Sequence, residues 1–131
     1  MAKKLVVITG GGSRHSTSAM MGERLRDCTL TAAQQSGIEI THQTFHLGNF
    51  TYDIADYLSD GFAGDELAAL LEAVRSADAL IAITPVFKAS YSGLFKLFWD
   101  ITEDGDIEGT PVLLAAVGGT GRHSLVLDHA L

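Results

Sequence analysis

Cysteine and basic residues are scarce in this sequence of 131 residues, and each shortage excludes a class of protein. The single cysteine, Cys28, cannot form a disulfide within the chain, which excludes a disulfide-stapled secreted scaffold. Nine lysines and arginines stand against 16 aspartates and glutamates, and the resulting net charge of -7 opposes binding to a nucleic acid or to an anionic membrane. We therefore expect neither as a partner.

Long hydrophobic runs are also absent. The apolar run after Lys3 and Lys4, LVVI, is shorter than the core of a signal peptide, and no stretch approaches the roughly 20 apolar residues of a membrane-spanning helix. With the lone cysteine, these absences predict a soluble protein of the reducing cytoplasm. The composition, 47% apolar and 19% charged, suits one globular domain, and we expect residues 1–131 to form it.

The motifs of several enzyme classes are missing. The Walker pattern GxxxxGK[ST] is absent, as is GxGxxG spacing with an acidic residue after the second strand, which disfavours a dinucleotide Rossmann site. Without a GxSxG elbow, a serine hydrolase is also disfavoured. His42 and His46 fall in a segment typical of a strand, where they lie about 13 Å apart and cannot share one ion. We expect no metal site.

Four segments have the pattern of β-strands. Three are nearly pure apolar runs, LVVI from Leu5, ALIAI from Ala79 and VLLAAV from Val112, as in parallel strands that helices cover on both faces. The fourth, IEITHQTFHL from Ile38, mixes apolar and polar residues. We expect it at the outer edge of the sheet.

Helical spacing separates these strands. Residues 49–64, an acidic and aromatic connection, are long enough to contain a further short helix. The alternation of strand and helix predicts an α/β domain with a parallel sheet, whose strand-to-helix loops gather at the carboxyl ends of the strands. The apolar stripes that predict the helices are Met21, Leu25, Cys28 and Ala32, with Gly37 as a stop; Leu67, Leu70, Leu71 and Val74; and Leu94, Leu97, Phe98 and Ile101.

The first loop, GGGSRHSTS, joins a buried strand to a helix. Its backbone amides and the positive end of the helix dipole face one point, which favours an anion. Arg14 adds a charged donor, and hydroxyl donors come from Ser13, Ser16, Thr17 and Ser18. The loop fits a phosphomonoester, and it fits equally well a turn that only caps the helix.

The second loop, PVFKASYSG, follows the third strand. Pro85 fixes φ and lacks an N–H donor, so we expect the chain after Thr84 to leave the sheet in an extended turn suited to lining a flat ring. Taken alone, Phe87 and Tyr91 are more typical of packing aromatics, and Lys88 of a solvated charge.

The third loop, GGTGRHS, follows the fourth strand and has more glycine and fewer hydroxyls than the first. Gly118, Gly119 and Thr120 can bring backbone amides to the edge of a planar ring. His123 is a further candidate contact, although a lone histidine at this place is more often a cap or a surface residue. The first and third loops are therefore expected to have different roles.

Together, GGGSRHSTS, TPVFKASYSG and GGTGRHSLVLDHAL resemble the NADPH-dependent FMN reductase family of flavodoxin-like proteins. More narrowly, they are similar to the reductases that supply reduced FMN to two-component flavin-dependent monooxygenases. The similarity runs from Leu5 to Leu131, and three motifs in order are more specific than any one of them. It implies a three-layer, doubly wound α/β fold with strand order 2-1-3-4-5.

The resemblance also implies which residues bind FMN. The first loop would hold the phosphate, the second would pack along the ribityl chain and ring, and the third would border the pyrimidine end. The implied cofactor-binding residues are Ser13, Arg14, Ser16 and Ser18; Pro85, Val86, Phe87, Ser90 and Tyr91; and Gly118, Gly119 and Thr120. Because hydride would pass directly from NADPH or NADH to the flavin, no catalytic acid, base or nucleophile is expected.

Members of this family continue through another strand and helix, whereas this chain stops at Leu131. We therefore expect a truncated domain without its last strand and helix, or a neighbouring chain that covers the bare fourth strand. The resemblance implies a homodimer or homotetramer, with Tyr91 similar to a tyrosine at a tetramer interface. Phe95 and Trp99 extend the apolar surface of the third helix, which fits a helix-to-helix interface and a broad buried face equally well.

Three functions remain open from the sequence. The first is an FMN reductase that passes reduced flavin to a partner monooxygenase. The second is a related reductase that retains FMN and reduces quinones, azo dyes or metal ions. The third is a non-enzymatic electron carrier of the flavodoxin type, which is disfavoured because the first loop contains Arg14 and is not rich in threonine.

Overall fold

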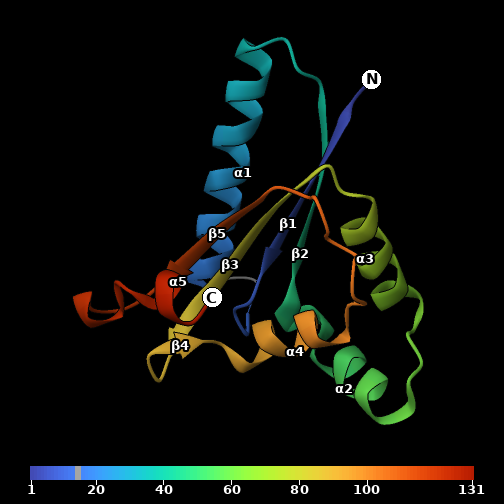
Figure 1. Cartoon of the computed structure of the whole chain (residues 1–131), viewed down its shortest axis with the longest axis vertical. Helices are drawn as coiled ribbons and strands as arrows, with labels where there is room; N and C mark the ends of the chain where they lie inside the picture. Colours follow the sequence, from blue (N-terminus) through green and yellow to red (C-terminus); the bar gives the residue numbers. More distant parts are fainter. Residues whose placement is uncertain (14–15) are drawn as a thin grey trace.

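A parallel sheet lies between two helical layers in the computed structural model, which describes residues 1–13 and 16–131 (Figure 1). The parallel strands are β1 (Lys3–Thr9), β2 (Ile40–His46), β3 (Ala79–Phe87) and β5 (Val112–Val117), in the order β2-β1-β3-β5. The two-residue strand β4 (Ser90–Tyr91) pairs antiparallel with β3. The expected parallel sheet and strand order are confirmed, with β5 as the expected fourth strand and β2 at the edge.

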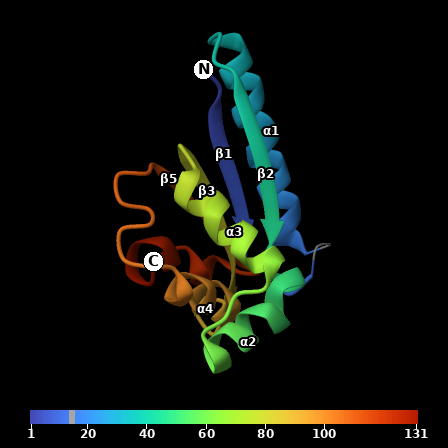
Figure 2. The same cartoon turned by 90° about the vertical axis from the view of Figure 1, so that its right-hand side faces the viewer.

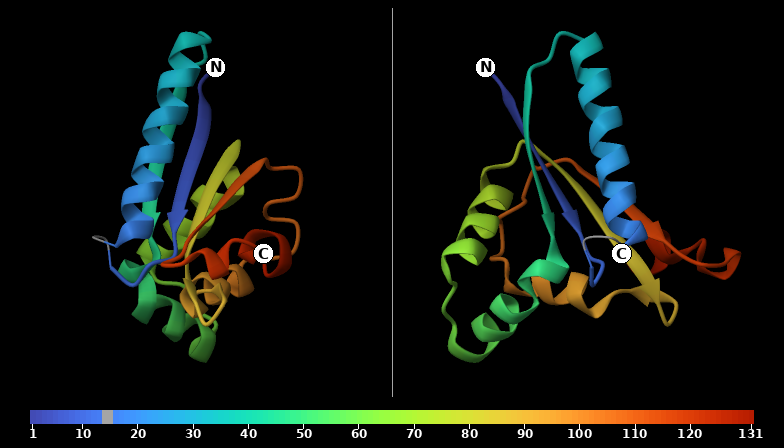
Figure 3. Two further views of the ribbon diagram at one scale, coloured as in Figure 1. Left: turned by 90° about the vertical axis from the view of Figure 1, so that its left-hand side faces the viewer. Right: turned by 180° about the vertical axis from the view of Figure 1, so that it is seen from behind.

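The helices cover the two faces of the sheet unequally (Figures 2 and 3). One face carries α1 (Thr17–Gln35), and the other carries α3 (Asp65–Ser76) and α4 (Gly93–Ile101). The expected short helix in residues 49–64 is α2 (Thr51–Asp60), which follows the turn η1 (Leu47–Phe50). The chain closes with η2 (Gly121–His123) and α5 (Val126–His129). No helix of the described residues combines the length and the apolarity needed to cross a membrane.

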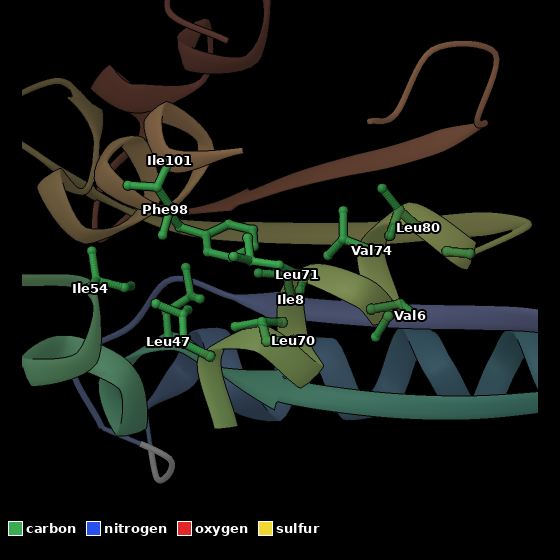
Figure 4. Packing of buried hydrophobic residues seen from close by; sticks show 13 residues of the cluster. Val6, Ile8, Leu47, Ile54, Leu70, Leu71, Val74, Leu80, Phe98 and Ile101 are labelled. Atoms are coloured by element: carbon green, nitrogen blue, oxygen red, sulfur yellow. The ribbon is translucent and has the colours of Figure 1, made fainter. Parts of the chain in front are cut away.

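The alternation of side chains along the strands divides the core into two clusters. Val6, Ile8 and Leu80 point toward α3 and α4, where they meet Phe98 and the leucines of α3 (Figure 4). The alternate residues of these strands point to the opposite face of the sheet, toward α1: Leu5, Val7, Ile81 and Ile83. The predicted stripe of α3 is confirmed, since Leu67, Leu70, Leu71 and Val74 are all buried.

The predicted apolar stripe of α1 is wrong except at Leu25, which is partly buried and packs against the sheet. Met21 is 38% exposed and Cys28 is exposed, whereas the buried residues of the helix are Ser18, Ala19, Gly22 and Ala33. The reason is close packing: a Cβ on Gly22 would lie 2.7 Å from Cγ2 of Thr9. The end of the helix is as predicted, because Gly37 has a left-handed φ of 73°.

The predicted stripe of α4 is correct in part. Phe98 and Ile101 are buried, but Leu97 is 40% exposed and Phe95 is buried in its place. The ring of Phe95 packs beside Gly10, where a Cβ would lie 3.0 Å from Cδ1 of Phe95. Phe95 therefore belongs to the core of this chain. On the outer face of the helix, a side-chain hydrogen bond from Lys96 to Asp100 raises the pKa of Lys96.

The expectation that the chain leaves the sheet after Thr84 is wrong. Pro85 lies within β3, which continues to Phe87 and then turns back into β4. The amide of Gly10 donates to the carbonyl of Ile83 at 2.7 Å, so the nitrogen of Pro85, two residues on, faces the same side of β3. Pairing with β1 has already ended there, at Thr9. The missing N–H of Pro85 therefore costs no ladder hydrogen bond.

Candidate functional site

The three loops gather at the carboxyl ends of β1, β3 and β5, as expected from a parallel sheet. They surround a hollow of about 540 Å³. Its lining comes from all three loops and from the first turn of α1: Gly11, Gly12, Ser16, Thr17, Ser18, Pro85, Val86, Phe87, Val117, Gly118 and Gly119. We call this space the rim hollow.

The first turn of α1 provides an anion-binding end to the rim hollow. Ser16 is the N-cap, and its Oγ accepts a hydrogen bond from the amide of Ala19 at 3.1 Å. The first-turn amides of Thr17 and Ser18 have no acceptor within the helix, and no acidic residue occupies this turn. Position 11 has room only for glycine, because a Cβ there would lie 2.9 Å from Cβ of Ser16.

Ser18 is the polar residue that the protein leaves unsatisfied in this wall. The residue is 1% exposed, and its Oγ has no hydrogen-bond partner among the described residues. A buried hydroxyl without a partner is unfavourable, because it loses its hydrogen bonds to water on folding. Ser18 lines the rim hollow, so an acceptor bound there would satisfy it. Of the two serines, Ser16 therefore caps the helix, and Ser18 is the one whose hydroxyl is available to an anion.

A buried hydrogen-bond network fixes the loops relative to one another. Ser92 is the N-cap of α4, where its Oγ accepts from the amide of Phe95 at 3.1 Å and donates to the carbonyl of Gly10 at 2.9 Å. The amide of Ser92 donates to Oγ1 of Thr84 at 2.9 Å, and that hydroxyl donates to the carbonyl of Pro85, also at 2.9 Å. Both hydroxyl residues are fully buried.

Sequence reasoning missed this network. The signal that could have found Ser92 is its position directly before a helical apolar stripe, which is the place of an N-cap. Its bond to Gly10, 82 residues away, has no local signal. Thr84 likewise reads as one more residue of a buried strand. The network holds the end of β1, the end of β3 and the start of α4 in one arrangement.

The end of β3 and the loop after β5 form the opposite wall. Pro85, Val86 and Phe87 line it from β3, and Phe87 is 59% exposed. Gly118 and Gly119 line it from the loop after β5. An exposed aromatic ring beside bare backbone is suited to a flat ligand.

The other predicted residues lie away from the lining. Ser90 and Tyr91 form β4, and Tyr91 contributes to a separate pocket with Phe95 and Trp99. Thr120 lines an adjoining pocket of about 230 Å³ that shares Val86 and Gly118 with the rim hollow. Their assignment to a ligand stays a prediction. Ser13 accepts at its carbonyl from the amide of Ser16 at 3.1 Å, and Arg14 lies outside the described residues.

Three lining residues were not among the predicted contacts: Gly11, Gly12 and Val117. Thr17, which also lines the hollow, was predicted as a hydroxyl donor of the first loop. The two glycines had a signal in the GGG run. Val117 is the last residue of β5 and had none beyond its position at the strand end.

Two histidines lie near the carboxyl ends of the strands, and the buried Nδ1 of one of them, His123, has no hydrogen-bond partner among the described residues. His46, at the end of β2, shares a hydrogen bond of 2.7 Å between its Nδ1 and Oγ1 of Thr9. His123 ends η2, and its ring packs against Gly118, where a Cβ would lie 3.0 Å from Cβ of His123. Among residues 1–13 and 16–131, no group of three or more His, Cys, Asp or Glu residues is placed to hold a metal ion.

Comparisons with known proteins point to one family. The sequence model described as NADPH-dependent FMN reductase matches residues 3–131. FMN reductase (NADPH) of Pseudomonas aeruginosa is 36% identical over 128 residues, covering 98% of this chain and 66% of that protein. NADH-dependent FMN reductase SfnF of Pseudomonas fluorescens is 37% identical over 129 residues, covering 98% of this chain and 66% of that protein. The chain thus spans just under two thirds of these relatives' length.

Solved structures give the same picture. An oxidoreductase from Corynebacterium diphtheriae superposes with a TM-score of 0.94 at 33% sequence identity, over 98% of this chain and 71% of that one. NADH:FMN oxidoreductase EMOB, in its apo form, superposes with a TM-score of 0.83 at 31% identity, over 98% of this chain and 65% of that one.

Proposed function

The chain belongs to the NADPH-dependent FMN reductase family, and from this membership we propose that it binds FMN in the rim hollow for reduction by NADPH or NADH. The relatives' names include both nicotinamide cofactors. The reaction would be transfer of a hydride from the nicotinamide to the flavin. The proposal extends to the cofactor-binding residues named from the sequence.

The single observation that carries the proposal is the unsatisfied hydroxyl of Ser18. It is 99% buried, lines the rim hollow, and lies in the first turn of a helix, where free backbone amides favour an anion. FMN carries one phosphate and one flat ring. The hollow provides hydroxyl and amide donors in one wall and an exposed aromatic with bare backbone in the other. These residues fit FMN.

Each wall would have its own part in binding. Ser18 and the first-turn amide of Thr17 would donate to phosphate oxygens, and Ser16 would keep that turn in place as its N-cap. Pro85, Val86 and Phe87 would position the ribityl chain and ring, and Gly118 and Gly119 would bring amides to the ring edge. Ser13, Arg14, Ser90, Tyr91 and Thr120 complete the proposed set.

When bound, FMN supplies a ring that accepts a hydride, so the protein needs no acid, base or nucleophile of its own. The chain must hold the flavin ring in one position and leave one face of the ring open to the nicotinamide. The buried network of Ser92 and Thr84 serves the first need, because it fixes the loops that carry both walls. The exposed ring of Phe87 marks the side at which the second reactant would enter.

Anaerobic oxidation of NADPH and NADH tests the proposal. The chain is assayed with and without added free FMN, and with a quinone as the acceptor. Oxidation that depends on added FMN is expected. Turnover of the quinone by tightly retained flavin would instead support a reductase that keeps its FMN, and no nucleotide oxidation would contradict both.

We propose further that reduced FMN leaves the site for a flavin-dependent monooxygenase, and that the protein is a homo-oligomer. The support is the narrower resemblance of TPVFKASYSG and GGTGRHSLVLDHAL to the reductases of two-component systems. A coupled assay tests the first part: addition of a flavin-dependent monooxygenase and its substrate should yield oxygenated product in proportion to the NAD(P)H consumed.

A further inference from the structure

A two-residue hairpin forms the outer edge of the rim hollow. β3 and β4 pair as Val86 with Tyr91 and Phe87 with Ser90, which leaves Lys88 and Ala89 at the tip. Both tip residues have left-handed backbone, with φ of 52° and 61°. Such turns favour asparagine and glycine, because a Cβ clashes with the backbone in this conformation. The hairpin therefore holds two unfavourable residues at its tip.

The tip lies next to the proposed FMN site. Phe87, directly before it, lines the rim hollow, and the hairpin projects beside α5 at the carboxyl ends of the strands (Figure 1). Lys88 is exposed and forms no ion pair within the described part of the chain. A strained backbone that persists at the edge of a site points to a role for the residue it presents.

Most of the other described cations are placed differently. Lys3 and Lys4 lie at the amino end of β1, away from the hollow, and Lys96 pairs with Asp100. Arg26 and Arg75 pair with carboxylates, and Arg24 lies on α1. Arg122 in η2 is exposed and, like Lys88, forms no ion pair within the described part of the chain, but it lies on the loop after β5 and not on the hairpin. Lys88 is thus an unpaired positive charge on the hairpin edge of the hollow, as Arg122 is on the loop after β5. The net charge of the chain is -7, so a polyanionic substrate is otherwise repelled.

We propose that Lys88 binds the phosphate groups of the nicotinamide dinucleotide as it docks over the hollow. This inference rests on the proposed function. The first turn of α1 would already provide donors for the single phosphate of FMN. Lys88 is therefore available to bind a second anion. The dinucleotide brings a pyrophosphate and, in NADPH, a 2′-phosphate as well. The long lysine stem lets one ammonium reach them from a rigid tip.

The test measures binding without turnover. NADP⁺ and NAD⁺ are titrated by calorimetry into the FMN-loaded chain, and FMN into the apo chain, for wild type, Lys88→Gln, Lys88→Arg and Lys3→Gln. Lys88→Gln should weaken dinucleotide binding about fivefold and leave FMN binding unchanged, with the loss shrinking at high salt. Lys88→Arg should restore it, and Lys3→Gln, an equal change of charge at the other end of the sheet, should have no effect.

The outcomes are separable. A greater loss for NADP⁺ than for NAD⁺ assigns Lys88 to the 2′-phosphate, and equal losses assign it to the pyrophosphate; both support the proposal. Unchanged dinucleotide binding in Lys88→Gln, or the same loss in Lys3→Gln, would overturn it while FMN binding still upholds the proposed function. Failure of the wild type to bind FMN would overturn both.

Discussion

At the scale of single residues, Ser16 and Ser18 have opposite relations to the fold although they lie two positions apart. Ser16 caps α1, so its hydroxyl stabilises the protein without any ligand. Ser18 is buried, and its hydroxyl has no hydrogen-bond partner among the described residues, so none of them is stabilised by it in the ligand-free fold. A residue that is unfavourable for folding and lines a hollow is best explained by binding.

Ser18→Ala should therefore separate stability from affinity. Removing the unsatisfied hydroxyl should raise the free energy of unfolding of the apo chain by about 1 kcal/mol. The same change should weaken FMN binding about tenfold, because a donor to the phosphate is lost. Urea denaturation measures the first quantity, and quenching of flavin fluorescence measures the second.

Ser16→Ala is the matched control for this experiment. It should lower the free energy of unfolding by about 1 kcal/mol, because the cap of α1 is lost. Riboflavin, which has no phosphate, should bind wild type and Ser18→Ala alike. A less stable Ser18→Ala protein, or an equal loss of riboflavin affinity, would contradict the assignment of Ser18 to the phosphate.

The sequence was sufficient to single out both serines but not to distinguish them. A glycine- and serine-rich turn between a strand and a helix predicts an anion site or a cap. Which serine does which depends on the fit of Gly11 against Ser16 and on the burial of Ser18. Both are features of the tertiary structure, which the local sequence does not contain. Ser92 and Thr84 were missed for the same reason, since their partners are distant in sequence.

At the scale of elements, α1 shows why apolar spacing can predict the wrong face. The spacing favoured Met21 and Cys28, yet the helix packs through Ala19 and Gly22. Small residues let its axis approach β1 and β3 closely, and an apolar pattern gives small residues little weight. The stripe of α3 was predicted correctly because that helix packs through leucines, which dominate such a pattern.

Gly22→Ala tests the close approach of α1. In an open helix this change stabilises by about 1 kcal/mol. Here the new Cβ would lie 2.7 Å from Cγ2 of Thr9, a fully buried β-branched side chain that has no room to move. We expect the free energy of unfolding to fall by about 1–3 kcal/mol, as for other overpacked cores.

Gly93→Ala provides the comparison for Gly22→Ala. A Cβ on Gly93, at the start of α4, meets nothing within 4 Å. This variant should be as stable as wild type or more so, by thermal or urea denaturation. Equal stability changes in the two variants would show that α1 does not pack at the distance described.

Ala89→Gly tests the strain in the hairpin. Glycine accepts a φ of 61° without the Cβ clash that alanine has, so the free energy of unfolding should rise by about 1 kcal/mol. FMN and dinucleotide affinities should stay at their wild-type values, because Lys88 is unchanged. A decrease in stability would show that the tip is not strained. The sequence did not predict this hairpin, because a proline such as Pro85 is rarely found inside a strand.

At the scale of the whole molecule, the sheet has two edges of different character. β2 is an edge strand with polar residues along it. β5 pairs with β3 alone among the described strands, and Leu113 and Leu114 on it are 50% and 39% exposed. An apolar edge strand is a template for pairing with another chain. We expect self-association through β5.

Leu113→Lys should reduce this association. Sedimentation velocity of the wild-type chain should show a concentration-dependent oligomer, and the lysine should shift it toward the monomer. Leu58→Lys, at a 53% exposed leucine of α2, is the control and should leave the distribution unchanged. A wild-type chain that stays monomeric at high concentration, or equal effects of the two variants, would argue against β5 as the contact.

The central claim is that FMN binds where the three loops meet, and amide NMR during an FMN titration tests it most directly. We predict that the amide signals of Gly11, Gly12, Thr17, Ser18 and Gly118 shift together and saturate at one FMN per chain. Signals at the amino ends of the strands should stay in place. Saturable shifts confined to other surfaces, or no shifts at all, would contradict the account.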